Sequence, residues 1–338
     1  MIVYTDDCII MGPDAKQLDR MFKKLQGSFN ITLEGTLCDY LGIMIKKGDN
    51  NSLIMTQPHL IASILHDLGL DKPNTNEVDT PASAKKIIAQ DLHEPKHDDL
   101  QFDYRSVIGK LNFLEKSTRP EIAEAVHQCA RFSANPRKSH TQAVKRIGRY
   151  LKGTATKGII MIPGKTESFD CWVDSSHAGE WKREGAEDDP STARSRMGYV
   201  FMYANCPILW SSKMQTEIAL STTEAEYMAL SMAVREIIPL TQLFQEAKDR
   251  GIDVDVNKAK VRCRLFEDNR GAAEIARVPK FRPRTKHINL KYHHFREHVK
   301  SGLLQIEDID TENQLADIFT KPLDANLFQR FRRGILGW

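Results

Sequence analysis

Apolar and polar residues alternate in short runs at the start of the chain. Residues 1–4 and 8–11 are apolar and β-prone. Thr5, Asp6 and Asp7 lie between them. Two such runs around a polar tripeptide predict a β-hairpin with two carboxylates at its tip.

The rest of the N-terminal segment mixes helical and β spacing. Apolar positions recur three and four residues apart over residues 18–29, after the helix-opening sequence Gly12-Pro13-Asp14, and again over residues 60–68. These spacings predict two helices. Between them lie three β-prone runs, at residues 31–35, 39–46 and 52–57.

A polar stretch separates this segment from a helical one. Residues 71–102 are rich in Pro, Lys, Asp and His and have little periodicity, so we expect a linker or loop there. Helical spacing then returns in three runs, at residues 104–117, 121–133 and 139–153. We therefore expect a small helical module over residues 103–153.

The spacing changes again in the C-terminal half. β-type runs lie at residues 169–174, twice within 198–212, at 261–266 and at 303–309. Helical runs lie at residues 221–250, 269–276 and 288–300. The capping box Thr311-x-x-Gln314 predicts one more helix, which carries Asp317. This order of elements predicts an α/β sheet layered with helices.

Composition narrows the class of protein. The chain has 338 residues, enough for two or three domains, and its 41% hydrophobic content excludes wholesale disorder. The net charge of +3 is mild, but basic residues cluster, which favours a polyanion partner. Solvated faces explain any single basic run equally well. None of the 6 cysteines forms a C-x-x-C pair, which is typical of an intracellular protein with reduced thiols.

Four acidic residues stand at positions where carboxylates are costly unless they bind a cation. Asp174 and Asp268 come at predicted strand ends, and Glu226 and Asp317 lie on apolar faces of predicted helices. Converging oxygen donors suit Mg²⁺ or Mn²⁺. Two such ions, roughly 3.5–4 Å apart, can serve phosphodiester hydrolysis, so the pattern predicts a metal-dependent phosphodiesterase.

Neighbouring acids compete for the same roles. Glu224 and Glu226 are two residues apart and cannot share a helix face. Small apolar residues flank Glu226 at helical spacing, so we favour Glu226 and keep Glu224 as its alternative. Asp170, Glu267 and Asp310 are interpreted as ordinary surface acids.

The motifs resemble a known family. The order strand-end Asp, helix Glu, strand-end Asp, helix Asp resembles ribonuclease H, and Tyr4-Thr5-Asp6-Asp7 between apolar strands resembles the polymerase hairpin of reverse transcriptases. The motifs that follow occur in a fixed order: YLGIMI, YRSVIGKLNFLEKSTRPEI, RYLKGT, GYVFMY, ILWSSKMQTEIALSTTEAEYMAL, KHINLKYHHFREHV and NQLADIFTKPL. Over essentially the whole chain, this series closely resembles the C-terminal part of the polyprotein of copia-type LTR retrotransposons.

The resemblance implies a fold for each part of the chain. The expected class is α/β: a ribonuclease H-like mixed sheet flanked by helices, preceded by a partial reverse transcriptase palm and thumb (α+β) and a helical connection. The implied segments are a partial palm and start of thumb at 1–72, a linker at 73–102, a helical thumb or connection at 103–165, ribonuclease H at 166–322 and a C-terminal tail at 323–338.

The resemblance also implies roles for residues. Asp6 and Asp7 would be a remnant of the polymerase hairpin, and the four nuclease carboxylates would be catalytic and hold two Mg²⁺ or Mn²⁺ ions. A basic loop would contact nucleic acid through Lys280, Arg282, Arg284, Lys286 and His287. A packed or capping histidine is an equally good interpretation of His287.

The implied function is hydrolysis of RNA in RNA–DNA hybrids. Expected partners are the hybrid, template and primer nucleic acid, and other Pol and Gag products of the element. The implied location is intracellular, in the cytoplasm within a virus-like particle of the parent element, with the nucleus as a second compartment. No apolar run is long enough to span a membrane, so no membrane partner is expected.

Alternatives stay open at this point. Met1 stands directly on an expected core strand, so we expect that upstream sequence is missing. The family's further palm Asp would lie there, and polymerase activity would be lost. One alternative is a decayed, catalytically silent element copy that only binds nucleic acid. Another is a different nuclease of ribonuclease H fold, such as an integrase or resolvase.

Overall fold

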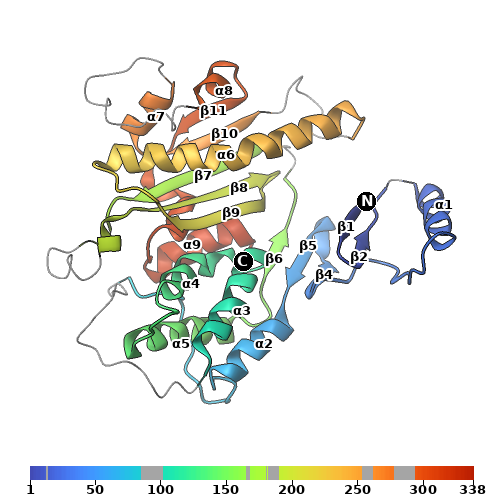
Figure 1. The fold of residues 1–338 in the computed structure, drawn as a ribbon, viewed down its shortest axis with the longest axis horizontal. Coiled ribbons are helices and arrows are strands. Elements are labelled where there is room, and N and C mark those ends of the chain that lie inside the picture. Colours follow the sequence, from blue (N-terminus) through green and yellow to red (C-terminus); the bar gives the residue numbers. More distant parts are fainter. Residues whose placement is uncertain are drawn as a thin grey trace.

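A five-stranded mixed sheet forms the centre of the computed structural model, which describes residues 1–12, 14–84, 102–164, 168–179, 181, 190–252, 262–277 and 294–338 (Figure 1). The strands are β7 (Phe169–Ser176), β8 (Arg196–Tyr203), β9 (Cys206–Met214), β10 (Cys263–Glu267) and β11 (Leu304–Asp308). Their order in the sheet is β11-β10-β7-β8-β9. β7, β8 and β9 are antiparallel neighbours, whereas β10 is parallel to both β7 and β11. The expected mixed α/β sheet is confirmed.

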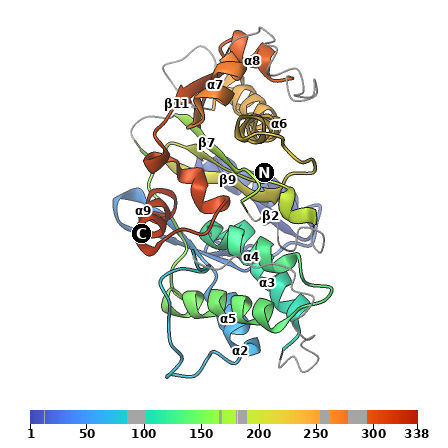
Figure 2. The same ribbon diagram turned by 90° about the vertical axis from the view of Figure 1, so that its left-hand side faces the viewer.

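Side chains of the central strands reach both faces of this sheet. On β7, Phe169, Cys171 and Val173 join one buried cluster, whereas Trp172 packs against another. This follows from strand geometry, because successive side chains point to opposite faces. The sheet is therefore covered on both sides, and Figure 2 shows it between two helical layers.

One layer consists of α6 (Thr222–Asp249), α7 (Arg270–Arg277) and α8 (Arg296–Lys300). The Ser221 hydroxyl oxygen accepts a hydrogen bond from the Glu224 backbone N–H at 3.1 Å. A serine at this position pairs a backbone donor that a helix start otherwise leaves unsatisfied. Ser221 therefore fixes where α6 begins, and with it the position of every side chain in its first turns.

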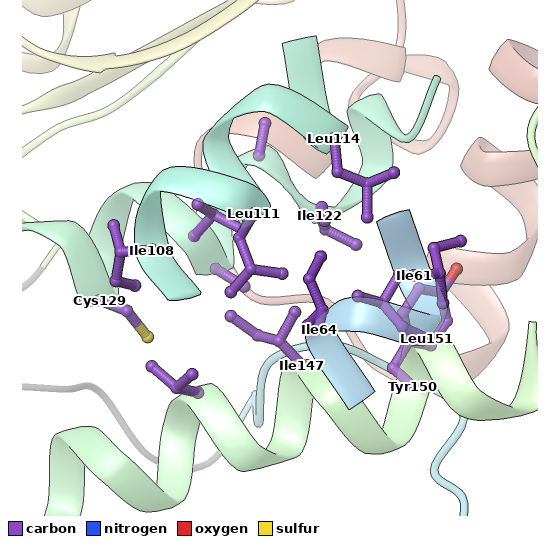
Figure 3. Close-up of a cluster of buried hydrophobic side chains, with 14 of the residues drawn as sticks. Ile61, Ile64, Ile108, Leu111, Leu114, Ile122, Cys129, Ile147, Tyr150 and Leu151 are labelled. Carbon is purple, nitrogen blue, oxygen red and sulfur yellow. The ribbon is translucent and has the colours of Figure 1, made fainter. Parts of the chain in front are cut away.

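The other layer is a helical module with its own core. It contains α3 (Tyr104–Ser117), α4 (Ala123–Ala130) and α5 (Lys138–Gly153), with the short 3-10 turn η2 (Pro120–Ile122), and α2 (Pro58–Asp67) packs against it. Figure 3 shows apolar side chains of α2, α3, α4 and α5 pointing toward one another, including Ile61, Ile64, Ile108, Leu111, Leu114, Ile147 and Leu151.

The end of the chain is part of this module. Residues that the sequence suggested as a tail form α9 (Ala325–Leu336), which begins at the capping residue Asp324. Phe328 and Phe331 of α9 are buried in the same cluster as α3–α5, together with Val200 and Met202 of β8. The helical module and the central sheet therefore share one continuous apolar core.

A second, four-stranded sheet joins distant parts of the chain. Its order is β3 (Asp39–Tyr40), β4 (Ile43–Lys47), β5 (Leu53–Thr56) and β6 (Ile159–Met161), all antiparallel, with η1 (Asp49–Asn51) between β4 and β5. The sequence analysis did not predict β6, a strand of only three residues in the short apolar run 159–162. The strand expected at residues 31–35 is absent, and that segment is exposed coil.

The first residues form an exposed hairpin and helix. β1 (Ile2–Tyr4) pairs antiparallel with β2 (Asp7–Ile9), and Thr5 in the turn has φ +49°. The following helix, α1 (Ala15–Gln26), is capped by Asp14 and has no buried residue. The predicted hairpin is present, but Asp7 belongs to β2 rather than to the turn. The reverse transcriptase palm and thumb expected for residues 1–72 stay a prediction.

The helix expected around Asp317 is replaced by two short turns. η6 (Thr311–Asn313) and η7 (Leu315–Phe319) are both 3-10 helices, and Gln314 between them is extended. The capping-box prediction was therefore wrong in this respect. The Gln314 side chain instead caps η7, by accepting from the Ala316 N–H at 3.2 Å, and donates to the Val173 carbonyl at 2.9 Å. A further 3-10 turn, η3 (Pro190–Ala193), precedes β8.

Candidate metal centre

Three of the acids singled out from the sequence converge at one edge of the central sheet. Asp174 lies near the end of β7, Asp268 directly follows β10, and Glu226 lies near the start of α6. Each offers an oxygen within 4.8 Å of those of the other two. β7 and β10 are parallel neighbours, so their C-terminal ends meet at the same edge, where α/β proteins commonly bind ligands.

Asp317 adjoins this group through Asp174. Hydrogen bonding between the two side chains contributes to the pKa of Asp174, and the Thr320 hydroxyl also donates to the Asp174 carboxylate. The position of Asp317 depends on η7, which Gln314 fastens to β7 through the Val173 carbonyl. The structure therefore places Asp317 beside the three converging acids, but not within the mutually close group.

The two competing glutamates on α6 have different surroundings. Glu224 accepts from the Leu220 N–H at 2.8 Å, so its carboxylate completes the start of the helix. Glu226 is 4% exposed and points to the sheet edge, and its Oε2 has no hydrogen-bond partner among the described residues. The geometry therefore favours Glu226 over Glu224 for the acidic group, while the role of Glu226 stays a prediction.

Two acids interpreted from the sequence as ordinary surface residues are buried. Glu267 is 0% exposed, and Asp170 accepts two hydrogen bonds from Arg264, at 2.6 and 2.8 Å. The interpretation was wrong for both, whereas Asp310 is exposed as expected. A signal for Glu267 was present, because Cys263, Leu265 and Glu267 alternate on one buried face of β10.

Burial perturbs the ionisation of this group. The pKa of Asp317 is raised to about 7, chiefly by burial and in part by the charge of the neighbouring Asp174 carboxylate. The pKa values of Asp174, Glu226 and Glu267 are also raised, chiefly by burial, with the charge of Asp268 adding to each. Clustered buried carboxylates of this kind are stabilised by a cation, so the donor set fits a hard divalent metal.

Comparison with known proteins identifies the family. The chain is 32% identical to the retrovirus-related Pol polyprotein from transposon RE1 of Arabidopsis thaliana, over 98% of this chain. It is 31% identical to that from transposon TNT 1-94 of Nicotiana tabacum, over 97% of this chain. The chain belongs to the Pol polyproteins of copia-type retrotransposons.

This Pol-family chain spans only part of its relatives. It covers 21% of the RE1 polyprotein and 24% of that from TNT 1-94. No protein-family model matches it. Among solved structures, a ribonuclease H domain from Mycobacterium tuberculosis, fused to maltose binding protein, aligns with 50% of this chain and 98% of its own. The identity is 12% and the TM-score 0.29, a likeness too low to support a conclusion.

Of the other predicted site residues of this Pol-family chain, the structure describes Asp6 and Asp7. Asp6 and Asp7 lie on the exposed N-terminal hairpin, and no third acidic or histidine side chain of the described residues completes a metal-binding group with them. The predicted nucleic-acid contacts lie outside the described residues: Lys280, Arg282, Arg284, Lys286 and His287.

Several polar residues that the sequence analysis did not single out for this site form hydrogen bonds that hold the acids or their elements in place. Thr311 donates to Asp268 at 2.8 Å. Gln215, 3% exposed, follows β9 and donates to the Ser175 hydroxyl at 3.2 Å and to the Ala225 carbonyl at 2.8 Å. Gln215 thereby connects the end of β7 to the first turn of α6, next to Glu226. Single Thr and Gln residues carry no local signature, so only the fold identifies them.

The sequence analysis expected no membrane-spanning segment, and the helices of the described residues can be compared with this expectation. Among them, no helix is both long enough and apolar enough to cross a membrane.

Proposed function

We propose that this chain carries a ribonuclease H-type site that hydrolyses the RNA strand of RNA–DNA hybrids with Mg²⁺ or Mn²⁺. The observation that carries the proposal is the convergence of Asp174, Glu226 and Asp268 within 4.8 Å, with Asp317 beside Asp174. Membership of the Pol family supports this choice among metal-dependent phosphodiesterases.

In this proposal the acids bind the metal ions, and neighbouring threonines orient the acids. Asp174, Glu226, Asp268 and Asp317 would hold two divalent cations, which, when bound, activate a water molecule and stabilise the leaving 3′ oxygen. Thr311 and Thr320 each donate to one of these carboxylates and so fix its orientation. Outer partners of metal ligands are commonly worth about 10- to 100-fold in affinity or activity.

The remaining functional expectations belong to the same proposal. The substrate is an RNA–DNA hybrid, contacted through its phosphates by the basic residues of 280–287, and template, primer and other Pol and Gag products are its partners. The compartment is intracellular, as implied by the family. We assign no polymerase step to Asp6 and Asp7.

A cleavage assay tests the proposal. The chain is incubated with labelled RNA–DNA hybrid and Mg²⁺, beside Asp268→Asn and the matched control Asp310→Asn. Asn at position 268 keeps an acceptor for Thr311 but lacks the ligand charge, so we expect a rate at least about 100-fold lower. Asp310 is exposed and outside the acidic group, so its variant is expected to cleave like the parent.

The outcomes separate the candidate functions. A folded parent chain that binds the hybrid without cleaving it, in Mg²⁺ and in Mn²⁺, would contradict the proposal and support a catalytically silent protein that only binds nucleic acid. Equal rates for the parent and Asp268→Asn would place any cleavage outside this site.

A further inference from the structure

A lysine lies against the proposed metal ligands. Lys321 Nζ is 2.9 Å from Asp317 Oδ1, and the lysine side chain is 43% exposed whereas that of Asp317 is 2% exposed. At this distance the ammonium and the carboxylate form an ion pair. The charges of Asp174 and Asp268 also act on Lys321.

The contact between Lys321 and Asp317 differs from an ordinary surface ion pair. Exposed pairs contribute little to stability, because water screens both partners. Here the acid is buried next to a second buried acid, Asp174, so an adjacent cation offsets repulsion that water cannot screen. Lys321 thus supplies part of the positive charge that these carboxylates require.

The backbone holds this lysine in place while its end can move. The Lys321 backbone N–H donates to the Asp317 carbonyl at 3.2 Å, and the preceding Thr320 is bonded to Asp174. The partly exposed side chain also lines a small pocket with Glu121 and Glu124 of the helical module. When the ammonium leaves Asp317, water can therefore solvate it, because the lysine side chain is 43% exposed.

We propose that Lys321 is a tethered cation that competes with divalent metal for the Asp174–Asp317 side of the site, and so sets the metal concentration at which the site fills. This rests on the proposed function, because it takes the carboxylate group as the metal site. A bound divalent ion and the ammonium cannot both take Asp317 Oδ1, and their like charges repel.

Direct metal binding tests this role without relying on cleavage. Mn²⁺ is titrated calorimetrically into the whole chain and into Lys321→Met, with Lys321→Arg to keep the charge and Lys300→Met, an exposed lysine on α8, as the matched control. We expect Lys321→Met to bind Mn²⁺ about tenfold more tightly at low salt. The difference is expected to shrink at high salt, because ions screen charge.

A second measurement uses the metal-free protein. Lys321→Met leaves the buried acids uncompensated, so its midpoint of thermal unfolding at pH 8 is expected to fall, and added Mn²⁺ is expected to raise it more than in the parent. Lys321→Arg and Lys300→Met are expected to behave like the parent in both measurements.

The results separate this inference from the proposed function. A parent chain that binds no divalent ion overturns both. A parent that binds Mn²⁺, with a folded Lys321→Met that binds it equally or more weakly, overturns the competition alone, because the lysine would then be neutral or would help to place Asp317.

Discussion

At the residue scale, two glutamates of α6 differ in surroundings rather than in chemistry. We expect Glu226→Gln to lower hybrid cleavage by more than about 100-fold, since even the outer partners of a metal ligand are worth about 10- to 100-fold. Glu224→Gln keeps an acceptor for the Leu220 N–H and is expected to retain both activity and thermal stability. Cleavage rates and unfolding midpoints of the two variants check this. Loss of activity in Glu224→Gln alone would reverse the assignment.

The raised pKa values of the buried acids in the site predict that the stability of the folded protein depends on pH. The folded protein keeps a proton on Asp317 up to about pH 7, whereas the unfolded chain releases it near 3.8. Between these values the folded state binds more protons, so the free energy of unfolding falls as pH rises. Burial raises the pKa values of Glu226 and Glu267 as well, and they act in the same direction.

We therefore expect the metal-free protein to lose thermal stability between about pH 5 and pH 8. Thermal unfolding followed by circular dichroism in the presence of a chelator measures this loss. Asp317→Asn removes one of the titrating groups and is expected to flatten the slope. A midpoint that rises over this range in the parent would contradict the assignment of raised pKa values.

At the element scale, η7 can approach β8 only because Gly198 has no side chain. A Cβ at this position would lie 2.5 Å from Phe319 Cβ and 2.9 Å from Thr320 Cγ2. We expect Gly198→Ala to lower the free energy of unfolding by about 1–3 kcal/mol. β8 and η7 pack so closely that neither can make room for the added methyl group without displacing the other. The displaced turn carries Asp317 and Thr320, so Mn²⁺ affinity is expected to fall as well.

The matched control for this prediction is Gly109→Ala in α3, where a Cβ meets open space. It removes a helix glycine without a clash, so stability is expected to stay equal or to rise by about 0.4–1 kcal/mol. Chemical denaturation and Mn²⁺ titration of both variants provide the comparison. An unchanged Mn²⁺ affinity in Gly198→Ala would show that η7 does not position the site.

At the scale of the whole molecule, the central sheet depends on the helical module for one of its faces. Val200 and Met202 are buried against that module, and Trp172 and Trp210 pack on the same cluster. We expect a chain shortened to residues 166–322 to unfold at a lower temperature and to bind an apolar dye, because this face becomes exposed.

Removal of residues 1–37 is the control for the shortened chain. These residues include β1, β2 and α1, which contribute no buried side chain, so the unfolding midpoint is expected to stay within a few degrees. Fluorescence of the dye and the unfolding midpoint are measured for both shortened chains. Equal stability of the 166–322 chain and the full chain would show that the two parts fold independently.

The sequence by itself determined what depends on local spacing. The β-type runs of β7 and β8, the long helical run of α6 and the order of the acidic motifs were readable, because strand and helix signals lie within a few residues of one another. The family was readable as well, because its motifs occur in a fixed order along the chain.

Only the tertiary structure decided which residues meet. It decided that Glu226 rather than Glu224 joins Asp174 and Asp268, that Glu267 is buried, and that β6 completes a distant sheet. It also turned the expected helix around Asp317 into 3-10 turns and placed Lys321 against that acid. The physical reason is that burial and pairing depend on contacts between elements that lie far apart in the chain, which no local pattern encodes.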